Sequence, residues 1–197
     1  MTDREKFVSA LRETKREGVE RVIRGLEELG FFEAPASTAF HLNRAGGLLA
    51  HSLNVYVEAL ALRELQVKMR PELAEALPGD SVALVALLHD VCKAEIYKTV
   101  EKFRKDKNDR WEKYKAYDAD YSALPLGHGE KSVIRLLRWG LAITDDEALA
   151  IRWHMGAWDL SDSTEARKSF NAASQRSRLL SLLIAADGLA TRILEAD

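Results

Sequence analysis

A histidine–aspartate pair, His89-Asp90, follows directly after the apolar run 82–88. Burying ionisable side chains at the end of a hydrophobic helix costs free energy unless a partner or a metal ion compensates them. Imidazole nitrogen and carboxylate oxygen are ligands that suit borderline divalent metals, and an aspartate can bridge two ions. The pair therefore predicts a metal-binding site.

The rest of the chain supplies further ligands of the same types. Four of its five histidines form an ordered series with two aspartates. His51 follows small residues that permit close helix approach, His128 lies between two glycines, and Asp187 stands in a nearly apolar stretch. The predicted metal ligands are His51, His89, Asp90, His128, His154 and Asp187.

Helical periodicity dominates the elements that must position these ligands. Apolar spacing predicts helical segments within 7–29, a long helix over 47–69, a helix leading into the His-Asp pair, and a last helix over about 175–194. Asp80-Ser81 is expected to cap the helix before the pair, and the capping-box pattern of 144–147 predicts a helix ending at His154. We expect the residues before Lys6 and after Leu194 to fray.

One region, about 97–117, departs from helical periodicity and predicts a β-hairpin. Aromatic and β-branched residues flank its turn-like sequence 106–109. The region holds eight basic and four acidic residues, a net charge of +4, whereas the whole chain carries −2. A basic, aromatic flap suits a phosphate-bearing substrate. Its charges could equally serve only to keep an exposed edge soluble.

Length and composition indicate one compact domain, residues 1–197. Hydrophobic residues make up 47% and charged residues 30%, which is ordinary for a globular protein. The single Cys92 excludes an intramolecular disulfide and is expected to be a buried helix residue rather than a nucleophile. The N-terminus lacks the apolar core of a signal peptide, and no apolar stretch could span a bilayer. We therefore expect a cytoplasmic protein with no membrane partner.

The ordered series H…HD…H…H…D resembles the HD superfamily of metal-dependent phosphohydrolases, from about residue 40 to residue 194. The segment 88–93, Leu-His-Asp-Val-Cys-Lys, is similar to the superfamily's L-H-D-x-x-K motif, with Cys92 where glycine is common. The segments 46–51, 126–129 and 153–156 resemble the HD domain of bacterial 3′→5′ exoribonucleases. His128 and His154 together resemble the two-metal subgroup.

The resemblance implies an all-α fold, a helical bundle of the HD type, here with one inserted β-hairpin. It also implies that one metal is held by His51, His89, Asp90 and Asp187, and a second by His128, His154 and a bridging Asp90. The two ions could be Mn, Fe, Co, Ni or Zn, since all suit these ligand types. Such a pair can activate a hydroxide for in-line attack at phosphorus.

We therefore expect a divalent-metal-dependent phosphohydrolase or phosphodiesterase that acts on a nucleotide, dinucleotide or short oligonucleotide. The expected catalytic residues are Asp90 and Lys93, because Lys93 lies one helical turn from His89 and can neutralise phosphate charge or protonate a leaving group. The expected substrate-binding residues are His41, Arg44, Lys98, Lys113 and Lys115. Two alternatives remain open: an HD-type di-iron oxygenase, which would use the same ligands, and a non-catalytic nucleotide-binding HD module.

Overall fold

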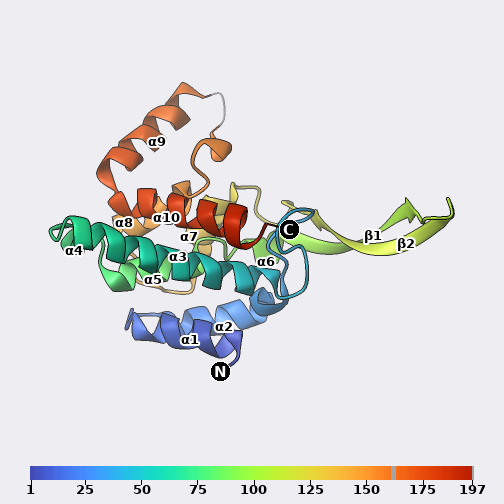
Figure 1. The fold of residues 1–197 in the computed structure, drawn as a ribbon, viewed down its shortest axis with the longest axis horizontal. Coiled ribbons are helices and arrows are strands. Elements are labelled where there is room, and N and C mark those ends of the chain that lie inside the picture. Colours follow the sequence, from blue (N-terminus) through green and yellow to red (C-terminus); the bar gives the residue numbers. More distant parts are fainter. Residues whose placement is uncertain (161–162, 197) are drawn as a thin grey trace.

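The computed structural model describes residues 1–160 and 163–196. Figure 1 shows a helical body from which one β-hairpin projects. In chain order the elements are α1 (Asp3–Glu13), α2 (Val19–Leu29), η1 (Phe31–Glu33), α3 (Gly47–Met69), α4 (Leu73–Ala76), α5 (Gly79–Leu88), α6 (Lys93–Ile96), β1 (Tyr97–Lys105), β2 (Trp111–Ala119), α7 (His128–Arg138), α8 (Asp145–Trp153), η2 (Gly156–Asp159), α9 (Thr164–Arg176), α10 (Arg178–Leu189) and η3 (Ala190–Leu194). The prediction of a helical protein with one inserted hairpin is confirmed. Within the described residues, no helix has the length and apolar character needed to cross a membrane.

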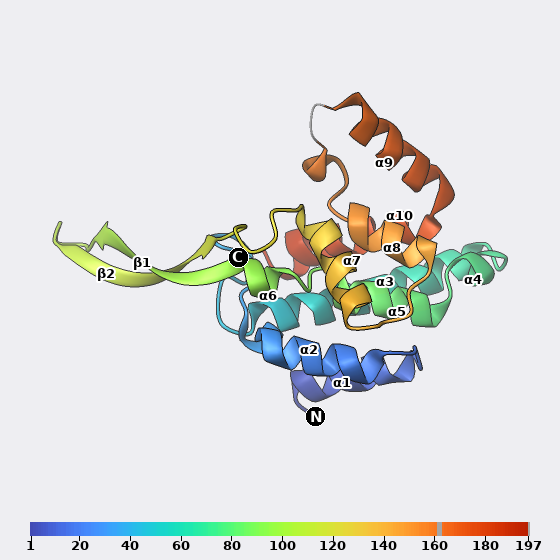
Figure 2. The same ribbon diagram turned by 180° about the vertical axis from the view of Figure 1, so that it is seen from behind.

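The core of the body forms around α3, which packs against α5 and α10. Helices α1 and α2 cover one side of this core, as Figures 1 and 2 show. Phe7 of α1 meets Phe31 and Phe32 of η1 with ring centroids 5.3 and 5.8 Å apart. All three rings are buried, and burying a side chain of this size stabilises a fold by about 1.5–3 kcal/mol.

Of the two predicted N-terminal caps, the one at α8 is confirmed and the one at α5 is wrong. The capping box of α8 is confirmed, because Thr144 Oγ1 accepts from the Glu147 amide at 3.2 Å and the Glu147 carboxylate accepts from the Thr144 amide at 2.7 Å. The predicted Asp80-Ser81 cap is wrong. Helix α5 begins at Gly79 after Pro78, and among the described residues no side chain caps this end. The fixed φ of proline suits a helix start, so Asp80 falls in the first turn, where it pairs with Arg16 at 2.9 Å.

The predicted last helix is wrong in its extent. Ser177 adopts an extended conformation (φ −104°, ψ 111°), and its Oγ accepts from the Leu180 amide at 3.3 Å. This serine separates α9 from α10, and a π-helical turn, η3, follows α10. The chain then turns inward, so that Glu195 is buried instead of frayed.

The predicted hairpin is confirmed, with β2 ending at Ala119 instead of near Tyr117. Its antiparallel register runs from the pair Tyr97–Ala119 to the pair Lys105–Trp111. At the turn, Asp106 Oδ1 accepts from the amides of Asn108 and Arg110 at 2.8 and 2.9 Å. In Figures 1 and 2 the strands point away from the helices, so the hairpin forms an arm.

Candidate metal centre

The His-Asp pair lies at the break between α5 and α6. Every residue from Val82 to Leu88 is buried, so α5 runs through the core and delivers His89 at its C-terminal end. The side chains of His89 and Asp90 are 0% and 1% exposed. Helix α6 then begins at Lys93. The break therefore places two ionisable groups in the middle of an apolar body.

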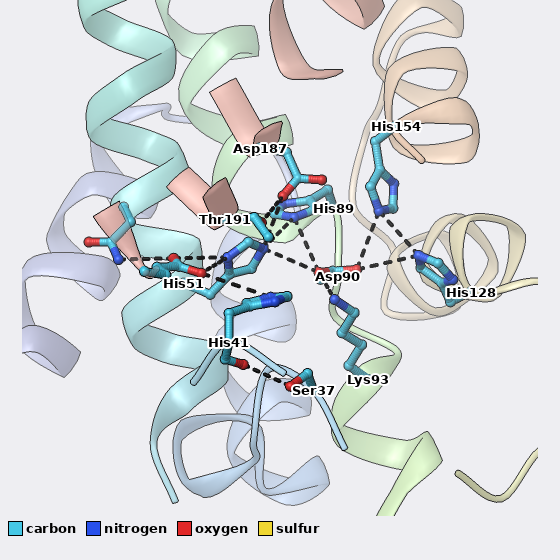
Figure 3. Close-up of polar contacts among 12 residues, drawn as sticks. Ser37, His41, His51, His89, Asp90, Lys93, His128, His154, Asp187 and Thr191 are labelled. Atoms are coloured by element: carbon cyan, nitrogen blue, oxygen red, sulfur yellow. Dashed lines mark hydrogen bonds and ion pairs between the residues drawn. The ribbon is translucent and has the colours of Figure 1, made fainter. Parts of the chain in front are cut away.

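Asp90 occupies the middle of the cluster in Figure 3. Its Oδ2 lies 3.3 Å from His89 Nε2 and 3.5 Å from His51 Nε2. His51 Nε2 is also 3.4 Å from Asp187 Oδ1 and 3.3 Å from His89 Nε2. Helices α3, α5 and α10 thus bring one group of nitrogen and oxygen atoms to one side of the Asp90 carboxylate.

The other oxygen of Asp90 faces a second group. Asp90 Oδ1 lies 3.3 Å from His154 Nε2 and 3.7 Å from His128 Nε2. The two histidine Nε2 atoms are 3.3 Å apart. His154 follows the last residue of α8, and His128 is the first residue of α7. The structure therefore brings all six predicted ligands together around one carboxylate.

Backbone carbonyls fix two of the rings. His89 Nδ1 donates to the carbonyl oxygen of Ala86 at 2.9 Å, and His154 Nδ1 donates to that of Ile151 at 2.7 Å. Because Nδ1 carries the hydrogen, Nε2 of each neutral ring presents a lone pair to the centre. Metal-binding histidines commonly have this arrangement, in which the second nitrogen donates to a carbonyl or carboxylate.

The donor atoms fit a metal ion. His51, His89 and Asp187 form one group, and His89, Asp90 and His154 another, with the ligand atoms of each group within 4.8 Å of one another. Asp90 Oδ1 is buried and accepts no hydrogen bond from a described residue. A buried acceptor without a donor costs about 1–3 kcal/mol or more. A cation between these atoms would remove that cost.

The electrostatics of the centre also favour a positive charge there. Burial disfavours charge on His51, yet Asp187, Asp90 and Glu195 outweigh it and hold the pKa of this imidazole well above its usual range. Burial likewise opposes ionisation of Asp90, but Lys93 and His89 hold the pKa of that carboxyl well below its usual range. Burial and repulsion from His154 lower the pKa of His128 to about 3, so this ring is neutral and one of its nitrogens offers a lone pair that can bind a metal ion.

Two residues that sequence reasoning missed support His51. Both oxygens of Glu195 lie 3.1 Å from His51 Nδ1, and Asn54 Nδ2 donates to Glu195 Oε1 at 2.9 Å. A carboxylate on the outer nitrogen of a ligating histidine fixes the ring and makes it more basic. Asn54 is one turn beyond His51 on α3, and that spacing is the one sequence signal available. Glu195 follows the predicted last helix and carries no such signal.

A third missed residue, Thr191, donates to Asp187 Oδ1 at 3.2 Å. Asp187 lies in α10, within the predicted last helix, and a helix places Thr191 one turn beyond it. Thr191 itself belongs to the π-helical turn η3, and such turns are frequent at functional sites.

A cavity of about 750 Å³ opens onto this cluster. Its volume lies within the range of about 300–1,000 Å³ that is usual for small-molecule sites. Its polar lining consists of His41, Lys93, His154, Asp187, Thr191, Arg192 and Glu195, and its apolar lining includes Phe40, Met155, Trp158 and Ile184. Lys93 lines the cavity, and its Nζ lies 2.6 Å from Oδ2 of the buried Asp90.

Of the predicted substrate-binding residues, His41 lines the cavity and the other four do not. His41 lies beside His51 with ring centroids 5.1 Å apart, and its Nε2 is 3.8 Å from Glu195 Oε2 (Figure 3). Arg44 is exposed on the loop before α3 and does not line the cavity. Lys98, Lys113 and Lys115 are exposed on the hairpin, away from the cavity, and Lys113 pairs with Glu101 at 2.6 Å.

The predicted burial of Cys92 is confirmed, but the residue lies in the turn between α5 and α6 instead of within a helix. It is buried, its Sγ donates to the carbonyl oxygen of His128 at 3.0 Å, and burial raises the pKa of the thiol to about 12. A thiol with such a pKa is not a nucleophile at neutral pH.

Two glycines beside ligands permit close backbone approach, as the sequence suggested. A Cβ at Gly129 would collide with the carbonyl oxygen of Arg152, so α7 can approach α8 this closely only with glycine there. A Cβ at Gly47 would collide with the carbonyl oxygen of Leu42. These contacts position His128 and His51.

No protein-family model, curated protein or solved structure matches this chain. The candidate centre is defined by its geometry, in which buried histidine and aspartate groups lie at distances suited to a metal ion.

Proposed function

We propose that this protein is a metal-dependent phosphoric ester hydrolase of the HD type, acting on a nucleotide, dinucleotide or short oligonucleotide. The first ion would be held by His51, His89, Asp90 and Asp187, and the second by His128, His154 and Asp90. Such ions lower the pKa of water and neutralise charge on phosphoryl oxygens.

The observation that carries the proposal is the position of Asp90. Its Oδ2 faces His51 and His89, whereas its Oδ1 faces His128 and His154. A carboxylate with a separate ligand group at each oxygen suits a bridging position between two ions.

Positive side chains in the cavity support an anionic substrate. Burial disfavours the charged form of Lys93, but the Asp90 carboxylate outweighs burial and raises the pKa of this lysine, so Lys93 stays protonated. Arg192 lines the same cavity. A persistently charged Lys93 suits the binding of a phosphate oxygen better than proton transfer to a leaving group.

Phosphate release tests the proposal. The metal-loaded protein should hydrolyse at least one member of a panel of nucleotides, dinucleotides and short oligonucleotides, and chelation should stop the reaction. Lys93→Gln should keep both metals but lower turnover by about 10²-fold, the size of effect seen on loss of one charge-stabilising donor. Lys68→Gln is the control, because Lys68 is exposed on α3.

The result that would overturn the proposal is a fully metal-loaded protein that hydrolyses none of these esters. Oxygen-dependent turnover of an organic substrate without phosphate release would assign the same ligands to an oxygenase.

A further inference from the structure

We propose that the outer half of the hairpin is a binding arm for single-stranded nucleic acid. Residues that pair across the two strands share a face of a hairpin. Here the pairs Phe103–Lys113, Lys105–Trp111 and Glu101–Lys115 form one face, which we call the platform face. It therefore combines two aromatic rings, three lysines and one acid.

Both rings of the platform face are open to solvent. Phe103 is 62% exposed and Trp111 is 69% exposed. Large aromatic side chains bury 150–250 Å² when they pack, so two exposed rings forgo much stabilisation. Lys105 Nζ lies 5.9 Å from the centroid of Trp111 and leaves this ring exposed. On the opposite face, in contrast, Arg104 lies 5.0 Å from the centroid of Tyr114, which is half-buried. The exposure is thus confined to one side of the arm.

The charge of the arm selects the kind of ligand. The segment 97–117 carries +4, so the rest of the chain carries −6. Lys113 is paired with Glu101 and Lys105 with Asp109, both at the exposed surface, where such pairs are weak and easily exchanged. A ligand with stackable rings and regularly spaced negative charges complements this face, and single-stranded nucleic acid has both.

A second copy of the hairpin fits less well. Edge-to-edge pairing of two arms would bring two segments of charge +4 together, and like charges disfavour such pairing. A two-stranded hairpin is also only marginally stable by itself in water, so a bound strand would stabilise the arm.

The base of the arm adjoins the metal centre. Strand β1 follows α6, which begins at Lys93, and the chain after β2 leads to His128. A strand bound along the platform face therefore lies on an element anchored between two parts of the centre. Binding by the arm is nevertheless independent of hydrolysis and of the function proposed above.

Fluorescence anisotropy with labelled single strands tests the arm. The probes are phosphorothioate oligothymidylate and oligouridylate of about 12 nucleotides, within the site sizes of single-strand-binding domains. The full-length protein should bind at least one of them and prefer it to a duplex of equal length. Trp111→Ala and Phe103→Ala should each weaken binding about tenfold, whereas Trp111→Phe should retain most of the affinity.

The salt dependence of probe affinity separates the contribution of ring stacking from that of the lysine charges. Changing Lys105, Lys113 and Lys115 together to Gln should reduce the slope of log affinity against log salt by about 2. The metal content and melting temperature of every variant should match those of the unaltered protein.

Three results would overturn the proposal: no binding of either probe, equal affinity in Trp111→Ala, or equal affinity for the duplex. Hairpin-dependent self-association in sedimentation, without probe binding, would assign the face to a second copy instead. Because the probes resist hydrolysis and no product is measured, this outcome is separate from the success or failure of the proposed hydrolase activity.

Discussion

Asp90 joins the two halves of the candidate centre, so its substitution should affect both. Asp90→Ala should abolish binding of both ions and all turnover, because each oxygen of the carboxylate faces one ligand group. His154→Ala should spare the ion at His51, His89 and Asp187. Elemental analysis of both variants measures the difference.

Asp90→Asn keeps the shape of the side chain and controls for folding, together with circular dichroism of all three variants. The ligand assignment is wrong if a folded Asp90 variant retains both ions and full turnover.

Glu195 should tune the affinity of the first ion through His51. Glu195→Gln removes the charge that both carboxylate oxygens direct at His51 Nδ1 from 3.1 Å. Loss of such an outer partner weakens metal binding by about 10–100-fold, and titration calorimetry with Zn²⁺ measures the change.

Glu64→Gln, an exposed change on α3, is the matched control and should bind Zn²⁺ as the unaltered protein does. Unchanged affinity in Glu195→Gln would show that this carboxylate only fills space.

At the scale of elements, the spacing of α7 and α8 depends on Gly129. Gly129→Ala should force the two helices apart, because its Cβ would collide with the backbone of Arg152. His128 would then move away from His154, and we expect loss of the second ion with retention of the first.

Gly79→Ala is the control, since its Cβ would make only an ordinary contact with Arg63. Two ions per chain in a folded Gly129→Ala protein would contradict the role assigned to this glycine.

The sequence predicted the elements best where a local signal marked their ends. The capping box of α8 set a helix start that the structure confirms, and the predicted bounds 47–69 of the long helix agree with α3. The sequence did not predict the break at Ser177, because neither glycine nor proline marks it. Both Pro78 and Asp80 are residues that favour a helix start, and α5 begins directly after Pro78.

The residues of the candidate site, like the helix ends, were predictable only where the local sequence carried a signal. The six predicted ligands stand in local sequences rich in glycine and apolar residues, where a polar side chain is conspicuous. Glu195 lies near the end of the chain among residues that read as exposed, and only the turn of η3 after α10 brings it to His51.

At the scale of the whole molecule, the candidate metal centre lies inside the helical core, so we expect its occupancy by metal to control stability. One ion that binds only the folded state, at about 100 times its dissociation constant, stabilises that state by about 2.7 kcal/mol. For a chain of this size that corresponds to a rise of about 5–10 °C in the melting temperature.

Thermal unfolding with Mn²⁺ or Zn²⁺ and with a chelator measures this shift, and Asp90→Asn should remove it. Ca²⁺, which prefers oxygen ligands, should have little effect. An identical melting temperature in metal and in chelator would show that the core does not depend on an ion.

The metal content of the protein tests the central claim most directly. After anaerobic purification with reductant and saturation with divalent transition metals, elemental analysis should find two ions per chain, as the two ligand groups on either side of Asp90 require. A chain that retains no transition metal, and takes up none on titration, would contradict the account.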